Sequence, residues 1–401
     1  MSQVQSASAS DLNRNKENGT LLDPYLDWAE AQGIPIHQDF GIDMLAVDVA
    51  DWPLYGARGA LAHVHGRGDY TSAYVLEVPA GGSTRPIRHL YEAFFYGLSG
   101  RGSTVVWTPD GSKHTFEWGP KALFCIPLNC RYQIFNGSGR ESARLACTHN
   151  LPLTMNLFHS EEFVFDNPSA FPERVGSNQQ FEGDGTFIGV APGRHMWETN
   201  YVPDLTNFEL KELEERGKGS TNITFILGDG TLHAHVSEIP ARRYKKAHRH
   251  GNGIHIYAVT GHGYSCLWYE GDAEYRQVPW RHGVMYAPPH WMFHQHFNTA
   301  PEAARYLAVG MGSRRYPFVG TRRKGAEFAT FTSIRDGGRQ IEYADQDPRF
   351  HRKWLEEIAR TGVTSIMGDV IDEKGVFAQP PDAFIGPIRS PRHESLAPTG
   401  W

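Results

Sequence analysis

Three histidines of this 401-residue chain have the side-chain type and the spacing of a metal site. His248 and His250 are two positions apart in the segment AHRHGNGIHIYAVTG, so both imidazoles point to one face if the segment forms a β-strand. His294 lies in a second segment, GVMYAPPHWMFHQHFN, and can add a third nitrogen from another strand. Neutral imidazole is a ligand for several divalent transition metals. We therefore expect the three histidines to bind one metal ion and to leave coordination positions open.

The positions around these histidines carry more information than a His-x-His pair alone, because the chain contains several such pairs. Two of them, His63/His65 and His233/His235, lack the surrounding landmarks, and we interpret them as strand or loop residues. The landmarks of the two metal-site segments are Ile254, Gly261, Gly283, Pro289 and Asn298.

A degraded copy of both segments lies about 161 residues upstream, which indicates an internal duplication. In this first copy, Ile87 and Tyr132 replace two of the three histidines, and His89 alone is kept. One histidine and one tyrosine hold a divalent ion poorly, so we expect the first copy to be structural. The matching positions are Glu77 and Glu238, His89 and His250, Gly100 and Gly261, Trp118 and Trp280, Asn136 and Asn298, and Arg144 and Arg305.

Both copies consist of short alternating segments that Gly, Asn or Pro turns interrupt, which is typical of β-strands. Roughly eight such strands in a copy predict a jelly-roll barrel. The expected fold is all-β, with two jelly-roll barrels in tandem and a few peripheral helices. The expected parts are a disordered tail (1–20), an N-terminal degenerate barrel (21–160), a helical linker (161–224), a C-terminal metal-binding barrel (225–325), and a C-terminal helix with an extended tail (326–401).

Three segments outside the repeats have helix signals. Asp23 and the following proline begin a helix over residues 24–32, and Asp347 and its following proline begin another over residues 348–361. The segment DLTNFELKELEERGKG predicts a helix that ends at Gly217 in the linker. The apolar face of the last helix, which we expect to pack on a barrel or across a dimer, consists of Phe350, Trp354 and Ile358.

Composition excludes several classes of function. A formal net charge of −6 gives no basic footprint for nucleic acid. No apolar run is long enough to cross a membrane, and the polar N-terminus does not resemble a secretory signal. The four cysteines form no CxxC pair, so we expect free thiols and a cytoplasmic protein.

The two metal-site segments resemble the paired signatures of the cupin superfamily, and the duplicated layout resembles a bicupin over about residues 70–310. Cupins commonly place a glutamate ligand seven residues before the motif glycine, and this chain has Ile254 there. A three-histidine set without this carboxylate resembles the gentisate, salicylate and hydroxynaphthoate ring-cleaving dioxygenases. The resemblance implies Fe(II) bound by His248, His250 and His294, with Mn, Ni or Zn as alternatives, and a homo-oligomer.

A divalent ion with three neutral ligands favours a small anionic substrate that binds through two atoms, and leaves a position for O2. We therefore predict a dioxygenase that acts on an aromatic or enolisable carboxylic acid. One alternative is a non-redox metal-dependent isomerase, lyase or hydrolase, and another is a non-catalytic binding cupin. Oxygen dependence and metal content distinguish these classes.

Several neighbouring side chains are candidates for substrate contact. His296 shares strand parity with His294 and, like His290, can hydrogen-bond a substrate. Arg281 and Arg243 are candidate clamps for a carboxylate. His255 becomes a fourth ligand only if its strand bulges, because strand parity favours an inward side chain for the preceding residue. Candidates for an aromatic wall, with core packing as the alternative, are Tyr257, Tyr264, Trp268, Trp291 and Phe293.

Overall fold

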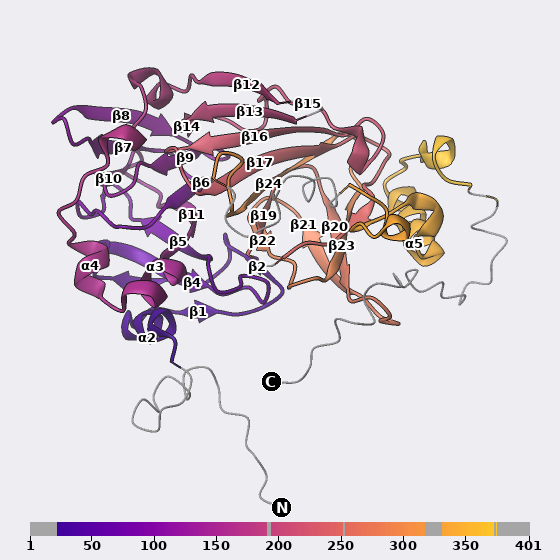
Figure 1. Cartoon of the computed structure of the whole chain (residues 1–401), viewed down its shortest axis with the longest axis horizontal. Coiled ribbons are helices and arrows are strands. Elements are labelled where there is room, and N and C mark those ends of the chain that lie inside the picture. The colour runs from indigo at the N-terminus through magenta and orange to yellow at the C-terminus, as the bar shows by residue number, and fades with distance from the viewer. Residues whose placement is uncertain (1–21, 191–193, 252, 317–330, 373, 375–401) are drawn as a thin grey trace, which may run out of the picture.

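The computed structural model describes residues 22–190, 194–251, 253–316, 331–372 and 374. These residues form two jelly-roll barrels that lie side by side, coloured indigo to magenta and magenta to orange in Figure 1. The predicted all-β fold with two tandem barrels and peripheral helices is therefore confirmed. The tail predicted over residues 1–20 and the extended segment over residues 379–401 lie outside the described residues.

The first barrel is built from two sheets whose strands are mostly antiparallel. Its strands are β1 (Ile36–His37), β3 (Ala50–Trp52), β4 (Ala57–Ala62), β5 (Ser72–Val78), β6 (Ala93–Ser99), β7 (Gly102–Trp107), β8 (Lys113–Trp118), β9 (Leu123–Ile126), β10 (Arg131–Asn136), β11 (Ala143–His149) and β14 (Tyr201–Val202). The larger sheet has the order β1-β4-β5-β11-β6-β9-β14, with β3 beside β4, and the smaller sheet has the order β10-β7-β8. Large aromatic side chains fill the space between the sheets, among them Tyr55, Tyr74, Phe95, Phe124 and Tyr132.

The second barrel repeats this arrangement. Its strands are β2 (Gly41–Asp43), β12 (Thr186–Val190), β13 (Arg194–Thr199), β15 (Lys211–Glu212), β16 (Thr221–Leu227), β17 (Leu232–Ile239), β18 (Ala247–His248), β19 (His255–Thr260), β20 (Gly263–Trp268), β21 (Arg276–Trp280), β22 (Val284–Tyr286), β23 (Phe293–Asn298), β24 (Ala304–Met311) and β25 (Gln340–Ile341). The larger sheet has the order β12-β13-β16-β17-β24-β19-β22-β2, with β15 beside β16, and the smaller has the order β21-β20-β23-β18-β25.

Equivalent side-chain interactions confirm the internal duplication. Arg144 Nε donates to Glu77 at 2.7 Å in the first barrel, and Arg305 Nε donates to Glu238 at 2.6 Å in the second. In both copies a second guanidinium nitrogen binds backbone carbonyls of the chain that enters the barrel. The sequence repeat is thus a repeat of structure.

The larger sheets of the two barrels pack against each other. One hydrophobic core contains side chains of both, among them Val75, Phe94, Phe225, Val236 and Leu307. Two strands also cross between the barrels. Strand β2, which comes from the N-terminal part of the chain, pairs with β22 of the second barrel, and β14 pairs with β9 of the first. The barrels are therefore joined by shared sheets as well as by packing.

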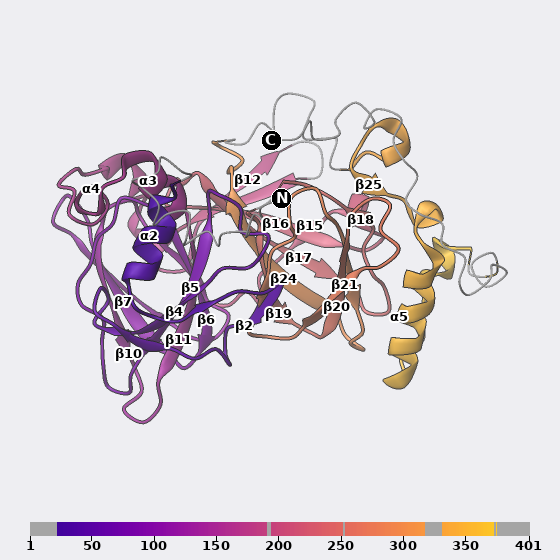
Figure 2. The ribbon, with the colours of Figure 1, turned by 90° about the horizontal axis from the view of Figure 1, so that it is seen from below.

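The helices lie at the two ends of the molecule. Helices α2 (Pro24–Ala31), α3 (Leu151–Phe158) and α4 (Glu161–Phe165) gather at one end of the first barrel, and α5 (Pro348–Arg360) lies along the far side of the second (Figure 2). Asp23 and Asp347 cap α2 and α5 as predicted, since each side chain accepts a backbone N–H. The apolar face of α5 packs on its own barrel, where Trp354 Nε1 donates to the Asn298 carbonyl at 2.7 Å.

The helix predicted over residues 204–217 does not form. This segment contains β15 and a short 3-10 helix, Glu214–Arg216. Arg305 binds the backbone carbonyls of Leu205 and Phe208, both at 2.9 Å, and so takes acceptors that a helix would use. The segment 161–224, which we predicted as a helical linker, also supplies β12 and β13 to the second barrel. Tertiary contacts therefore override a local helix signal here.

Candidate metal centre

Two neighbouring strands bring the first two predicted ligands together. His248 in β18 lies directly opposite His294 in β23, and their Nε2 atoms are 3.1 Å apart. Two nitrogens bound at about 2.1 Å to one ion at a right angle are separated by about 3 Å. In the first barrel, Ile87 and Tyr132 form the equivalent cross-strand pair.

His250 completes the group. Its ring centroid lies 4.6 Å from that of His294 and 5.7 Å from that of His248. One ligand atom from each of the three histidines can be chosen so that all lie within 4.8 Å of one another. Within the described part of the chain, this is the one group of at least three histidine, cysteine or acidic side chains that meets this distance.

Hydrogen bonds fix the imidazole orientations that a metal requires. The Nδ1 atom of His250 lies 2.6 Å from the Gly251 carbonyl, and that of His294 lies 3.2 Å from the Met292 carbonyl. A carbonyl only accepts, so each Nδ1 carries the proton and each Nε2 keeps its lone pair. Both Nε2 lone pairs are therefore available to an ion.

Burial keeps the three imidazoles neutral. It is the main cause that lowers the pKa of His250 to about 4 and the pKa values of His248 and His294 well below the usual 6.5. The guanidinium of Arg216 adds to this effect at His248 and His250. Neutral imidazole is the form that binds metal. Distances, tautomers and charge state thus fit a bound divalent ion.

The histidines line a cavity of about 550 Å³ in the second barrel. Ile254, at the position of the usual glutamate ligand, is part of its wall. Two arginines, Arg216 and Arg314, also line the cavity, whereas Asp69 is the single carboxylate among the described lining residues. The cavity is therefore positively charged. Its other polar lining residues are Tyr70, Asn222, Thr224, His233, His235, Ser237, His290, His296 and Tyr306.

A polar network holds His296 beside the ligands. Its Nδ1 lies 2.8 Å from Ser265 Oγ and 3.0 Å from the Tyr286 hydroxyl, and its ring stacks on Trp280. The His296 ring lies 5.5 Å from that of His294. His290 lines the same cavity but is exposed. The structure thus brings both predicted histidines to the cavity, one inside it and one at its surface.

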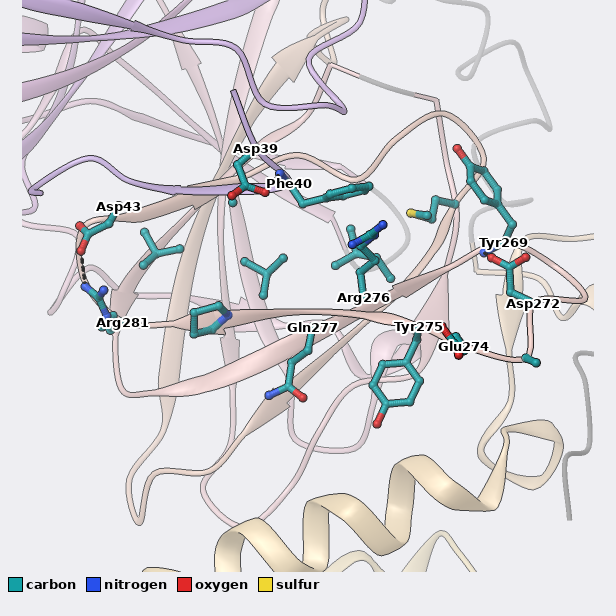
Figure 3. Close-up of a pocket in the computed structure, with 17 residues that line it drawn as sticks. Asp39, Phe40, Asp43, Tyr269, Asp272, Glu274, Tyr275, Arg276, Gln277 and Arg281 are labelled. Carbon is teal, nitrogen blue, oxygen red and sulfur yellow. Dashed lines mark hydrogen bonds and ion pairs between the residues drawn. The ribbon is translucent and has the colours of Figure 1, made fainter. Parts of the chain in front are cut away.

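The predicted arginine clamps are wrong. Arg281 lies in a separate surface groove of about 1070 Å³, where it donates to Asp43 at 2.6 Å (Figure 3). Its side chain is 58% exposed, and the residue does not line the metal cavity. Arg243 binds Asp369 through two nitrogens, at 2.9 and 2.7 Å. Each guanidinium is already paired with a carboxylate of the protein.

His255 and the predicted aromatic wall also lie outside the cavity. His255 is fully buried, and burial and then the charge of Arg67 lower its pKa. Because Arg67 belongs to the first barrel, the His255 side chain faces that barrel and not the cavity. The Tyr257 hydroxyl lies 2.7 Å from that of Thr148, again between the barrels. Strand parity is the reason, because alternate side chains face opposite sides. Tyr264, Trp268 and Phe293 face α5, and Trp291 lies beneath Arg249 and Arg339.

Sequence reasoning missed several lining residues. His233 and His235, which we interpreted as structural, share one face of β17 and line the cavity. Their two-residue spacing was the available signal. Tyr306 lies on β24 across the barrel, and Arg216 comes from the segment predicted as a helix. Neither position carries a local signal, since only the tertiary fold places these two side chains in the cavity.

The first barrel has no equivalent site among its described residues. His89 Nε2 lies 3.1 Å from the hydroxyl of Tyr132, the residue that stands where the second barrel has His294. The His89 ring also stacks on Tyr91 at 3.7 Å. These contacts support the prediction that the first copy is structural.

No protein-family model matches this chain, and neither does any curated protein sequence. Solved structures of Bacillus subtilis oxalate decarboxylase are similar to it. A mutant of that enzyme has a TM-score of 0.45 at 13% identity and covers 69% of this chain and 78% of its own. A structure from work on its Mn(II) centres has a TM-score of 0.44 at 14% identity, with the same coverage.

The cysteines bear on disulfide bonds, and the helices bear on membrane spans. The four cysteines are buried free thiols. Within the described residues, no helix combines the length and the hydrophobicity that a membrane span needs.

Proposed function

We propose that this protein is a metal-dependent enzyme that acts on a small anionic molecule in the cavity of its second barrel. The observation that carries this proposal is the convergence of three neutral imidazoles on one wall of a cavity that two arginines also line. His248, His250 and His294 hold the ion. When bound, the ion polarises a ligand oxygen, lowers the pKa of a coordinated hydroxyl and, if it is iron, supplies redox chemistry with dioxygen.

The protein side chains select and orient the substrate. With Ile254 in place of a carboxylate ligand, the three grouped ligands are all neutral and leave the charge of a bound ion unreduced, so an anion that binds through two atoms is favoured. Arg216 and Arg314 add charge that pairs with a carboxylate. His296 is held so that its ring reaches the same cavity.

We assign the reaction to an Fe(II)-dependent, O2-using dioxygenase that acts on an aromatic or enolisable carboxylic acid. Support comes from the absence of a carboxylate among the three grouped ligands and from the charge of the cavity. Three imidazoles also accept Mn, Ni or Zn. A non-redox isomerase, lyase or hydrolase is therefore the second candidate.

The test combines metal analysis with oxygen uptake. Purified full-length protein is assayed for bound metals, and the iron-loaded protein is screened against aromatic hydroxy acids and enolisable keto acids in an oxygen electrode. We expect His294→Ala to weaken iron binding by about a hundredfold or more and to abolish oxygen uptake. His65→Ala, which removes an exposed imidazole outside the cavity, serves as the matched control.

Two results would contradict this assignment in different ways. Turnover at an undiminished rate without oxygen would replace the dioxygenase with the non-redox class. Unchanged metal binding by His294→Ala would show that the site itself is misassigned.

A further inference from the structure

Lys245 is a buried basic residue next to the metal cavity. Its residue is 1% exposed, and its Nζ lies 3.4 Å from the Tyr306 hydroxyl and 4.9 Å from the centre of that ring. No ion pair joins Lys245 to a carboxylate among the described residues. Glu238, the acidic group whose charge raises the pKa of Lys245, is already bound by Arg305 at 2.6 Å. A lysine buried without a counterion is costly, and such residues often serve a reaction.

Tyr306 connects this lysine to the cavity. Its side chain lines the cavity, whereas Lys245 stands behind it. The Tyr306 ring lies 4.9 Å from that of His296 and 6.1 Å from that of His235, which both line the same cavity. The Tyr306 side chain therefore stands between the cavity and the amine of Lys245.

The internal duplication provides a comparison within the chain. Thr84 and Leu145 of the first barrel stand at the positions of Lys245 and Tyr306. The backbone is the same at both places, because Thr84 N–H donates to the Ile134 carbonyl as Lys245 N–H donates to that of His296. The fold therefore does not require the pair. It is present in the barrel that has the histidine cluster and absent from the other.

We propose that Tyr306 and Lys245 form a proton-transfer pair for the ligand that binds at the histidine cluster. This inference rests on the proposed function. The ligand hydroxyl loses its proton to the Tyr306 oxygen as Tyr306 passes its own proton to the neutral amine of Lys245. One O–H bond breaks in the ligand and one in Tyr306, and one O–H and one N–H bond form, with no change of oxidation state. Tyr306 is the catalytic residue, and Lys245 is a positioning residue that acts through it.

The surroundings of Lys245 suit this exchange. Burial, and then the charge of Arg216, lower its pKa to about 7, and Glu238 opposes them. The other groups that face it are the Tyr306 hydroxyl and the imidazole of His296. Burial also raises the pKa of Tyr306, so that hydroxyl stays protonated. Near neutral pH the amine is therefore present in both forms and can accept a proton and return it.

The probe for the test is 4-nitrocatechol, whose visible spectrum reports its own ionisation. Full-length protein loaded with Fe(II) is titrated with it anaerobically between about pH 5.5 and 9, a range that brackets ordinary histidine ionisation. The readout is the pH midpoint at which the bound probe becomes the dianion. Iron content and thermal unfolding are measured in parallel for each variant.

We expect Lys245→Met and Tyr306→Phe to raise this midpoint by about one pH unit, because the bound probe loses its proton acceptor. Lys245→Arg keeps the charge but cannot accept a proton, so it behaves like Lys245→Met. Tyr306→Phe preserves the ring and covers the case in which a lysine variant fails to fold. Tyr257→Phe removes a buried hydroxyl outside the cavity and leaves the midpoint unchanged.

The outcomes separate the two proposals. A midpoint that does not move in Tyr306→Phe, or a Lys245→Arg protein that matches the wild type, overturns the proton-transfer pair and leaves the proposed function intact. Wild-type protein that binds neither iron nor 4-nitrocatechol overturns both.

Discussion

Ile254 stands in the cavity wall at the position where a carboxylate side chain would neutralise part of the charge of a bound ion. A carboxylate there would compete with an anionic substrate, both for a coordination position and for positive charge. The side chain of Ile254 does neither. This apolar residue therefore contributes, together with Arg216 and Arg314, to the preference for anions that we assign to the site.

Arg216 is the lining residue whose charge we expect to affect ligand binding most. Its guanidinium is held by Gln340 Oε1 at 2.9 Å and by the Phe331 ring at 4.6 Å, which fixes it in the cavity wall. We predict that Arg216→Gln weakens salicylate binding to the metal-loaded protein by about tenfold or more, the usual effect of losing a hydrogen bond to a charged group. Isothermal titration calorimetry measures the affinity.

The control for this prediction is Arg281→Gln, since Arg281 lies outside the cavity and is mostly exposed. An equal loss of affinity in both variants would point to a general charge effect. Unchanged affinity in Arg216→Gln would remove this residue from the binding site.

Sequence spacing predicted which imidazoles meet at the candidate metal site, but it did not predict which guanidinium groups line the cavity. His248 and His294 lie on paired strands, whose geometry fixes the side to which each imidazole points, and His250 follows two residues after His248, just beyond the end of β18. Arg281 and Arg243 were wrong because a long flexible side chain can reach any nearby carboxylate, and both find one within the protein. Their partners are remote in sequence, so spacing carried no information about them.

At the scale of elements, the first barrel contributes a loop to the cavity of the second. The loop before β5 includes Asp69 and Tyr70, which line the cavity. Gly253, in the metal-site segment, donates its N–H to the Gly66 carbonyl at 2.7 Å and accepts from Thr71 Oγ1 at 3.0 Å. The copy without metal ligands thus builds part of the wall around the ligands of the other.

Gly66, in this loop, packs closely against the backbone of the second barrel. A Cβ at this position would lie 2.1 Å from the Ala287 carbonyl oxygen and 2.5 Å from the backbone of Pro288. We predict that Gly66→Ala lowers the free energy of unfolding by about 1–3 kcal/mol and weakens salicylate binding, because the loop must move away. Iron content should stay close to that of the wild type.

Gly139→Ala is the matched control, since a Cβ there meets no heavy atom within 4 Å. Chemical denaturation measures stability, and calorimetry measures affinity. Wild-type salicylate affinity in Gly66→Ala would show that the position of the loop does not matter to the cavity.

The elements also show where local signals fail. Both predicted helices with a capping aspartate and a following proline formed as α2 and α5, because their apolar faces found partners. The segment over residues 204–217 has comparable helix propensity, but Arg305 and strand β16 hold it in another conformation. Strand β16 follows directly in the sequence, whereas Arg305 lies much further along the chain, beyond the range of any local pattern.

At the scale of the whole molecule, buried histidines outside the metal site couple stability to pH. Burial lowers the pKa of His63 and His255 to about 3 and that of His89 to about 4. In the unfolded chain these groups titrate near 6.5. Between the folded and unfolded pKa values the unfolded state binds more protons, so stability that is present above pH 6.5 is lost as the pH falls toward 4.

We predict that the free energy of unfolding of the metal-free protein falls by about 1.4 kcal/mol per pH unit for each such histidine within this window. Urea denaturation at a series of pH values measures it. His255→Gln should reduce the slope by the share of one histidine. A stability that stays constant as the pH falls from about 6.5 to 5 would contradict the neutral state that we assign to these side chains.

The duplicated fold was predictable because the two copies keep their register. Glu77 corresponds to Glu238, and Arg144 corresponds to Arg305. Each glutamate forms the same ion pair with the arginine of its own copy. The packing of one barrel on the other was not predictable. Their shared core is formed by apolar residues that in sequence look like the interior of a single barrel.

The crossing of β2 into the second barrel has a consequence for the history of the chain. After a gene duplication, two copies can drift apart, separate or be lost independently as long as each folds alone. Here a piece of chain that lies between β1 and β3 of the first barrel completes a sheet of the second, and β14 adds to a sheet of the first. Neither copy can be discarded without opening the edge of the other. The copy without metal ligands is thus retained as an inseparable half of one heritable unit.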